Sequence, residues 1–335
     1  MDRYFRMVLR IAVSDPTAVC QLNLKFGAEP VRQAAELLKT AAEMGIAVVG
    51  ISFHVGSGCR DPSAFATAIK HARRLFNIGN ECGHCMTLLD LGGGYPGFPS
   101  TEITFEAIGR VINSALDRYF PATDSTNEVV EIIAEPGRFF AAAPYTLIAN
   151  IISTKEVDAG KICDDAKVDD KGYMYYLNDG VYGSFNCVLY DHVTPTGYAL
   201  DQPPAAERNR GESMRYPCSI WGPTCDSMDC ITPSTRLPLM NVGDWIVFPN
   251  MGAYTIAAYS DFNGFERPDM VYVCGKTEWH MYEKIRQPRL KSVCHVGTET
   301  KPNSSDYLTW NTEATNYMNK MMLSLRSLPI NDIFV

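Results

Sequence analysis

The sequence predicts an α/β part followed by an all-β part. We expect a partial TIM-type β/α barrel over residues 1–145 and an antiparallel β domain, sandwich- or barrel-like, over residues 146–335. The length of 335 residues exceeds one ordinary domain of about 100 to 200 residues. Apolar runs alternate with amphipathic stretches in the first part, and short alternating runs between turn residues dominate the second.

Four apolar runs of the first part are predicted to be parallel strands. They lie at residues 8–13, 47–54, 87–91 and 129–134. Because each is apolar nearly throughout, we expect both of its faces to be buried. Amphipathic stretches at residues 29–43 and 61–76 predict helices between them, with Pro30 suited to a first helical turn and Gly45 to a C-terminal stop.

The second part is predicted to contain antiparallel strands separated by loops. The alternating runs lie at residues 173–177, 245–248 and 270–273. Residues 156–171 are acidic and polar, and residues 193–217 hold four prolines, so both segments are predicted to be solvated surface loops. An amphipathic closing helix is expected over residues 313–328.

Composition restricts the function classes. Hydrophobic residues make up 46% of the chain and charged residues 20%, which disfavours a disordered protein. A net charge of -8 argues against nucleic acid or an anionic membrane as partner. The eleven cysteines are odd in number and scattered, and the N-terminus shows no signal peptide. We therefore expect a cytoplasmic protein without a membrane span.

Polar residues follow the second predicted strand. His54 ends it, and Ser57 lies between Gly56 and Gly58 directly after. Backbone N–H groups and a hydroxyl in such a turn can bind one anion, most often a phosphate. The alternative is a tight turn with a buried structural histidine.

The next two strand ends carry further candidates. Gly92, Gly94 and Gly97 formally fit a dinucleotide motif, but Pro96 interrupts it and no acidic residue follows at the required distance. A glycine-rich phosphate loop at a barrel mouth fits better. The fourth strand ends in residues 135–138, which include Glu135 and Arg138. Their alternative interpretation is a buried salt bridge.

Several polar turns lie in the second part, and each alone is an ordinary β-turn. The clusters are residues 178–186, 190–192, 221–226 and 250–254. Cys82 and Cys85 have redox spacing but lie in a helical stretch, and no second ligand pair completes a zinc site. We predict no metal.

Together the motifs resemble one family, the eukaryotic ornithine decarboxylases, which depend on pyridoxal phosphate and have an alanine-racemase-like barrel. The matching segments occur in the family's order and span nearly the whole chain. They are residues 53–59, 90–97, 135–138, 179–186, 190–192, 222–226 and 250–254.

The resemblance implies that the protein binds pyridoxal 5'-phosphate. His54 would stack on the pyridine ring, and Glu135 would keep the pyridine nitrogen protonated, so that the ring can accept the electron pair left by carbon dioxide. The phosphate would be held by Ser57, Gly94, Arg138 and Tyr254. The remaining cofactor residues implied are Arg10, Gly93, Pro136 and Gly137.

The resemblance also implies L-ornithine as substrate and a homodimer with shared active sites. Tyr190, Asp191 and Phe262 match the substrate pocket, and Asp226 matches a substrate carboxylate contributed across the interface. Cys225 matches the acid that reprotonates the α-carbon, which makes Cys225 and His54 the implied catalytic residues. Lys25 and Asp229 match positions that pair across the interface.

One departure concerns the lysine that binds the cofactor covalently in this family. That lysine precedes the segment matching residues 7–12, and none of this chain's lysines lies in a matching context. Four strands are also half of a closed barrel. We therefore expect an N-terminally incomplete chain with little or no activity.

Two alternatives stay open. The first is a catalytically dead homologue that regulates polyamines by binding antizyme, as antizyme inhibitors do. The second keeps the chemistry but changes the substrate to lysine, arginine or diaminopimelate. Asp191 and Asp226 disfavour diaminopimelate, whereas lysine differs from ornithine by one methylene, worth about 1 to 3 kcal/mol.

Overall fold

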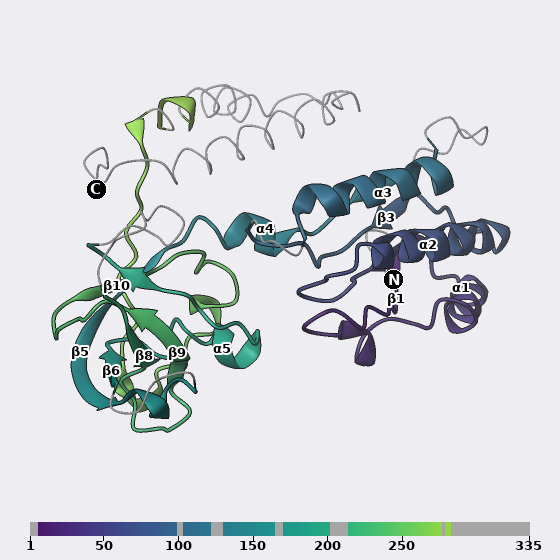
Figure 1. Ribbon diagram of the computed structural model, residues 1–335. Coiled ribbons are helices and arrows are strands. Elements are labelled where there is room, and N and C mark those ends of the chain that lie inside the picture. Colours follow the sequence, from purple (N-terminus) through teal and green to yellow (C-terminus); the bar gives the residue numbers. More distant parts are fainter. Residues whose placement is uncertain are drawn as a thin grey trace. The chain divides into compact units, whose positions relative to one another are not determined.

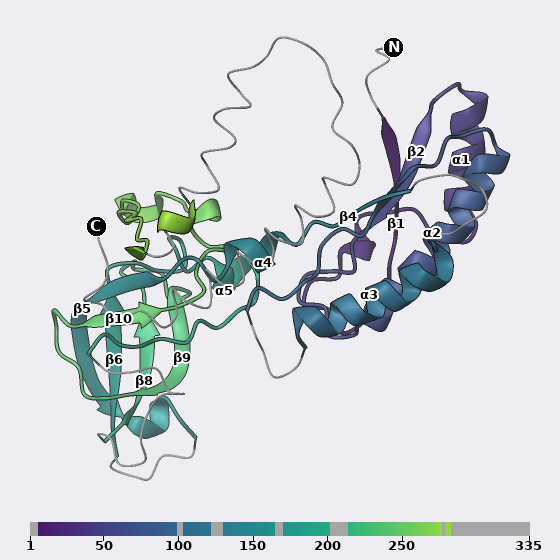
Figure 2. The same ribbon diagram turned by 90° about the horizontal axis from the view of Figure 1, so that it is seen from above.

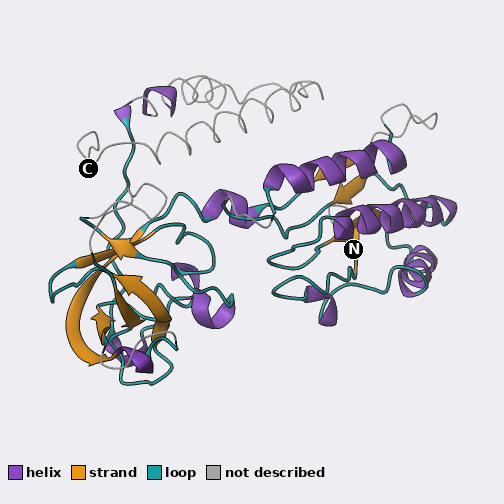
Figure 3. Ribbon diagram, in the orientation of Figure 1, coloured by secondary structure: helices purple, strands orange, loops and turns teal. Residues whose placement is uncertain are grey.

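The structure is a computed structural model that describes residues 6–98, 103–121, 130–164, 170–201, 214–276 and 279–282. The chain divides into two compact units, Met1–Arg267 and Pro268–Val335. The first unit holds two separate hydrophobic clusters, one formed by residues 11–115 and the other by residues 149–251. Helices and strands alternate around the first cluster, whereas strands dominate around the second (Figure 3).

The first cluster is built on a four-stranded parallel sheet. Its strands are β1 (Met7–Ile11), β2 (Val48–Phe53), β3 (Leu88–Asp90) and β4 (Glu131–Ile133). They pair in chain order, β1-β2-β3-β4, and every pair is parallel. This order is that of consecutive strands in a β/α barrel, so the predicted partial barrel and its four strands are confirmed.

Helices on one side of the sheet bury its apolar residues (Figure 2). They are α1 (Gln33–Glu43), α2 (Ser63–Glu81) and α3 (Phe105–Tyr119). Leu38, Phe65 and Ile108 are fully buried where these helices pack. The Thr104 hydroxyl accepts the Ala107 N–H at 3.2 Å and caps the start of α3.

The expectation that both faces of the strands are buried is wrong for the described residues. Ile51 and Phe53 of β2 are buried, whereas Ser52 between them is only half-buried. Ile132 and Ile133 of β4 are 40% and 39% exposed. The helices cover one face, and no described element covers the other.

The second cluster lies in a six-stranded sheet (Figure 1). Its strands are β5 (Leu147–Asp158), β6 (Lys171–Leu177), β7 (Tyr198–Ala199), β8 (Tyr216–Trp221), β9 (Cys230–Leu237) and β10 (Trp245–Phe248). The order is β7-β10-β5-β6-β8-β9. The predicted antiparallel β domain is confirmed, with one exception: the β6·β8 pair is parallel, which makes the sheet mixed.

The finer predictions for this part had different outcomes. Strands at residues 173–177 and 245–248 are confirmed, but residues 270–273 form no strand. Both predicted loops include residues that form strands. Residues 156–158 are the end of β5, and residues 193–217 contain β7 and the start of β8. The predicted closing helix at 313–328 lies outside the described residues.

Short helical turns complete the described chain. They are α4 (Gly137–Ala141), α5 (Cys187–Tyr190) and the 3-10 turns Leu22–Leu24, Ala159–Lys161, Ile256–Ala258 and Phe262–Gly264. Among the helices of the described segments, none combines the length and the apolar character that crossing a bilayer requires.

Candidate active site

His54 directly follows β2 and is neutral. Its Nδ1 accepts the Gly56 N–H at 3.0 Å, so any ring proton is carried by Nε2. Burial, together with the charge of Arg10, lowers the pKa of His54 to about 4. A neutral, half-buried imidazole presents a flat face on which an aromatic ring can stack.

The turn after His54 positions Ser57. The Ser57 N–H donates to the Cys20 carbonyl at 3.1 Å, and the Cys20 N–H donates back at the same distance. Cys20 belongs to the segment after β1, so two consecutive strand ends hold the serine in place. No sequence motif surrounds Cys20, so its backbone contact with Ser57 could not be predicted.

The glycine loop after β3 passes close to His54. Gly92 and Gly94 have left-handed backbone angles, with φ of +58° and +113°. A Cβ on Gly93 would lie 2.6 Å from Nε2 of His54 and 3.2 Å from the Glu135 carbonyl. Three predicted cofactor residues therefore converge at adjacent strand ends, and only a glycine permits this approach.

Glu135 and Arg138 both follow β4, but they have different partners. The Glu135 N–H donates to the Gly92 carbonyl at 2.8 Å, while its side chain is exposed. Pro136 caps α4, which begins at Gly137 and carries Arg138 into the site. Arg138 pairs with Asp191 and not with Glu135, which corrects the alternative of a Glu135–Arg138 salt bridge.

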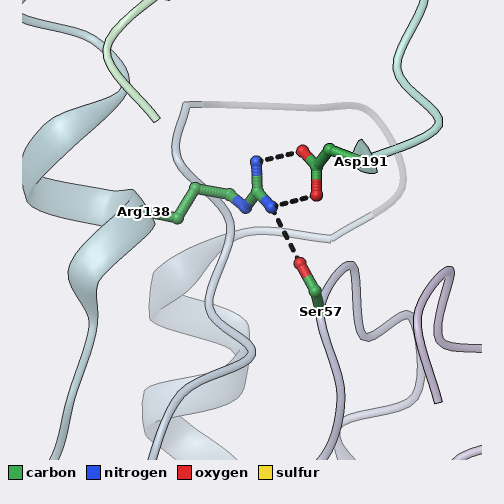
Figure 4. A network of polar contacts seen from close by, with 3 residues as sticks. All are labelled: Ser57, Arg138 and Asp191. Carbon is green, nitrogen blue, oxygen red and sulfur yellow. Dashed lines mark hydrogen bonds and ion pairs between the residues drawn. The ribbon is translucent and has the colours of Figure 1, made fainter. Parts of the chain in front are cut away.

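Arg138 is the centre of a polar network (Figure 4). Its Nη1 and Nη2 donate to the two carboxylate oxygens of Asp191, each at 2.7 Å. Nη2 also donates to the Ser57 hydroxyl at 2.8 Å. The guanidinium carbon lies 4.6 Å from the ring centre of Tyr254, within reach of a cation–π interaction. Only 18% of the Arg138 side chain and 8% of the Asp191 side chain are exposed.

A cavity of about 320 Å³ opens beside this network. Ser57, Arg138 and Asp191 line it together with Gly97 and Ala253. Some of the other lining residues, among them Val19, Cys187, Thr194 and Thr196, lie outside every predicted motif. Most of the exposed lining is apolar, so the charged groups of the site are few and well separated from bulk water.

Asp226, Cys225 and Phe262 form a second group. Asp226 accepts hydrogen bonds from the Tyr182 hydroxyl and the Met228 N–H, which lower its pKa. The same bond to Asp226 raises the pKa of Tyr182 to about 12. The Phe262 ring lies 4.3 Å from that of Tyr182. The exposed Cys225 thiol accepts a hydrogen bond from the Asn263 amide at 3.4 Å.

The structure does not bring all predicted residues together. Within the described residues, no hydrogen bond or ion pair joins the Asp226 group to Arg138. Tyr190 is adjacent to Asp191 in sequence but is 68% exposed. The Arg10 guanidinium lies 5.0 Å from the ring centre of Phe26, and its charge acts on His54.

Asp229 is bonded within its own chain. It is 1% exposed and accepts the Val181 N–H at 2.8 Å and the Thr224 N–H and hydroxyl at 3.0 and 2.7 Å. Lys25 is exposed, with its ammonium 5.1 Å from the Phe26 ring centre. The pairing of Lys25 with Asp229 across an interface stays a prediction, and it would require Asp229 to exchange bonds that already satisfy it.

The donor set of the site fits pyridoxal phosphate. A guanidinium fork, a serine hydroxyl and glycine backbone are the groups that bind phosphate elsewhere. A Cβ on Gly93 would collide with the His54 ring, so the glycine lets this loop lie against the imidazole on which a pyridine ring would stack. Ser57, Gly94, Arg138 and Tyr254 would hold the phosphate, while His54 and Glu135 would face the ring.

Comparison with known proteins shows which family the chain resembles. Residues 2–142 match the pyridoxal-binding domain of pyridoxal-dependent decarboxylases. The chain is 53% identical to ornithine decarboxylase of Caenorhabditis elegans over 84% of its own length and 63% of the relative, and 49% identical to that of Cricetulus griseus over 84% and 59%. It is also 44% identical to antizyme inhibitor 2 of Xenopus laevis over 84% and 59%.

Solved structures of decarboxylases are also similar to this chain. The arginine decarboxylase of Paramecium bursaria Chlorella virus superposes with a TM-score of 0.68 at 36% identity, over 80% of this chain and 65% of the viral one. A lysine/ornithine decarboxylase of Vibrio vulnificus, complexed with putrescine, superposes with a TM-score of 0.62 at 31% identity, over 79% and 63%. The chain spans about three fifths of the curated relatives it matches. In its strand order and in its sequence the chain is similar to the pyridoxal-dependent decarboxylases, and residues 2–142 match the pyridoxal-binding domain of that family.

Proposed function

We propose that the protein decarboxylates L-ornithine to putrescine with pyridoxal phosphate as cofactor. The observation that carries the proposal is the network in which Arg138, Ser57 and Asp191 meet in one cavity. It combines donors for a phosphate with a carboxylate for an ammonium group. Ornithine decarboxylases are also the relatives with the highest identities to this chain among those compared above.

The chain's own residues suit this reaction. Pyridoxal phosphate, when bound, supplies an electron sink for the pair left by the departing carboxylate. Arg138 and Ser57 would anchor its phosphate, and neutral His54 would fix the plane of its ring. Glu135 would hold a proton on the pyridine nitrogen, and the exposed Cys225 thiol would return a proton to the substrate carbon.

Substrate choice would depend on two carboxylates. Asp191 and Asp226 both suit the distal ammonium of ornithine, whose charge they neutralise. Tyr190 and Phe262 would complete the apolar walls. Lysine carries the same charge one methylene further, so we propose ornithine as the preferred substrate with residual activity on lysine.

We also propose a cytoplasmic homodimer whose active sites are shared. The separation of the Asp226 group from the Arg138 network is compatible with a site completed by Asp226 of a second copy. Antizyme is a possible further partner by family resemblance. Because the lysines of this chain match no cofactor-binding context of the family, we propose that the 335-residue chain alone is weakly active.

One alternative has a specific observation behind it. Antizyme inhibitors are 41% to 44% identical to this chain, only slightly below the decarboxylases. A regulatory homologue would bind antizyme and decarboxylate nothing. The presence of His54, Glu135 and Arg138 in one site favours the enzyme.

The experiment uses the protein isolated from its source cells alongside the 335-residue chain. Release of labelled carbon dioxide is measured from carboxyl-labelled L-ornithine and L-lysine with added pyridoxal phosphate. We expect the source protein to prefer ornithine and the 335-residue chain to be far slower. A source protein that binds antizyme and releases no carbon dioxide would establish the regulatory alternative instead.

A further inference from the structure

Asp191 occupies the place that a phosphate would need. Its two oxygens accept from both terminal nitrogens of Arg138, at 2.7 Å each. A carboxylate and a phosphate engage a guanidinium through the same parallel pair of N–H bonds. The two anions therefore compete for one donor fork, and Arg138 cannot offer both nitrogens to each at once.

The same contact removes Asp191 from any substrate. Both carboxylate oxygens face Arg138, and only 8% of the side chain is exposed. An ammonium group would have to displace a bidentate, partly buried arginine, whose charge would repel it. In this arrangement Asp191 is an internal anion rather than a binding group for a cation.

The backbone around Asp191 belongs to no long helix or strand. It follows α5, a turn of four residues, and residues 192–197 after it have no regular secondary structure. Ser57, by contrast, is held by two backbone hydrogen bonds to Cys20, and Arg138 is held on α4. The Asp191 N–H donates to the Cys187 carbonyl at 3.0 Å, but within the described residues its carboxylate bonds only to Arg138.

We propose that Asp191 holds Arg138 until a phosphate group replaces it, and that this exchange frees Asp191 to bind the distal ammonium of the substrate. Binding of a phosphate and binding of a diamine are then coupled: each raises the affinity for the other, by thermodynamic reciprocity. This inference rests on the proposed function for the nature of the two ligands. It adds an order of binding to that function, because the ammonium site forms only after a phosphate has bound to Arg138.

The first test measures phosphate affinity by calorimetry on the 335-residue chain. Inorganic phosphate is the probe, so no cofactor chemistry enters. Asp191→Asn removes the competing charge, and we expect phosphate to bind about tenfold more tightly, the change that about 1.4 kcal/mol produces. Asp158→Asn is the matched control, because it removes the same charge from an exposed carboxylate that accepts the Gly160 N–H outside the site, and its affinity should equal that of the unmodified chain.

The main comparison of the second test is made on the unmodified chain, so it stands even if Asp191→Asn fails to fold. Putrescine affinity is measured with and without saturating phosphate. We expect phosphate to raise putrescine affinity at least fivefold in the unmodified chain. In Asp191→Asn the enhancement should vanish, which separates the exchange from simple attraction between phosphate and diamine.

Two results overturn the inference. One is equal phosphate affinity in Asp191→Asn and the unmodified chain. The other is putrescine binding that phosphate leaves unchanged. Neither depends on turnover: a source protein that decarboxylates ornithine without this coupling overturns the inference alone, whereas coupling without decarboxylation overturns the proposed function alone.

Discussion

At the scale of single residues, hydrogen bonding and burial decide which groups of the site are charged. Gly56 donates to Nδ1 of His54, and a protonated ring would lose that acceptor. Arg138 has its charge matched by Asp191 inside a mostly apolar cavity. The site therefore combines a neutral ring with a guanidinium that could bind a phosphate in place of Asp191, which suits it to a planar, phosphorylated ligand.

The pKa of His54 predicts how stability changes with pH. The folded value of about 4 lies below the ordinary value of 6.5, so the unfolded chain binds a proton in this window and the folded chain does not. Stability should therefore fall as pH decreases from 6.5 to about 4, by up to roughly 3 kcal/mol.

Urea unfolding at several pH values measures this effect. His54→Phe, which cannot be protonated, should show a smaller loss between pH 6.5 and 4 than the unmodified chain. His192→Asn is the control, since asparagine tolerates the left-handed backbone at this position, where φ is 53°. An unchanged pH dependence in His54→Phe would contradict the assignment.

At the scale of elements, the strand ends are held together by close backbone contacts. A Cβ on Gly92 would lie 1.8 Å from the Phe53 carbonyl of the neighbouring strand. In the β part, Asp229 connects the turn after β6 to the turn after β8 through Val181 and Thr224. These contacts, rather than long helices, hold the site's loops in position.

Gly92→Ala should strongly destabilise the chain. Gly45 has a similar left-handed φ, +68°, but open space around it, so Gly45→Ala isolates the backbone strain from the clash. We expect Gly45→Ala to cost about 1 kcal/mol and Gly92→Ala at least about 2 kcal/mol more, measured by urea unfolding. Equal costs would mean that the close approach of β2 and the loop after β3 is wrong.

Asp229→Ala distinguishes a bond within the chain from one between subunits. The substitution would leave the Val181 and Thr224 donors buried without their acceptor, at a cost of about 3 kcal/mol. If the bonds are internal, this cost will not depend on protein concentration, and Lys25→Ala will be close to neutral. A loss that grows on dilution and is shared by Lys25→Ala would instead support the pairing across an interface.

At the scale of the whole molecule, the features that could be predicted from the sequence are those that depend on local residue patterns. The strands at residues 48–53 and 88–90, and the polar residues at their ends, follow from apolar runs and turn residues. The parallel pairing of β6 with β8 did not follow, because no local pattern distinguishes parallel from antiparallel partners. The contact between Arg138 and Asp191 joins residues 53 apart in sequence, and their spacing alone gave each a separate role.

The central claim is that Arg138 and Ser57 form a binding site for the phosphate of a pyridoxal-type cofactor. Calorimetry with pyridoxine 5'-phosphate and with pyridoxine tests it most directly, because neither compound has an aldehyde that could react with surface lysines. We predict that the phosphorylated compound binds at least tenfold more tightly and that Arg138→Ala removes most of the difference, since charge-assisted hydrogen bonds contribute about 1.5 to 3 kcal/mol. Equal affinity for the two compounds, or a preference that survives Arg138→Ala, would contradict the claim.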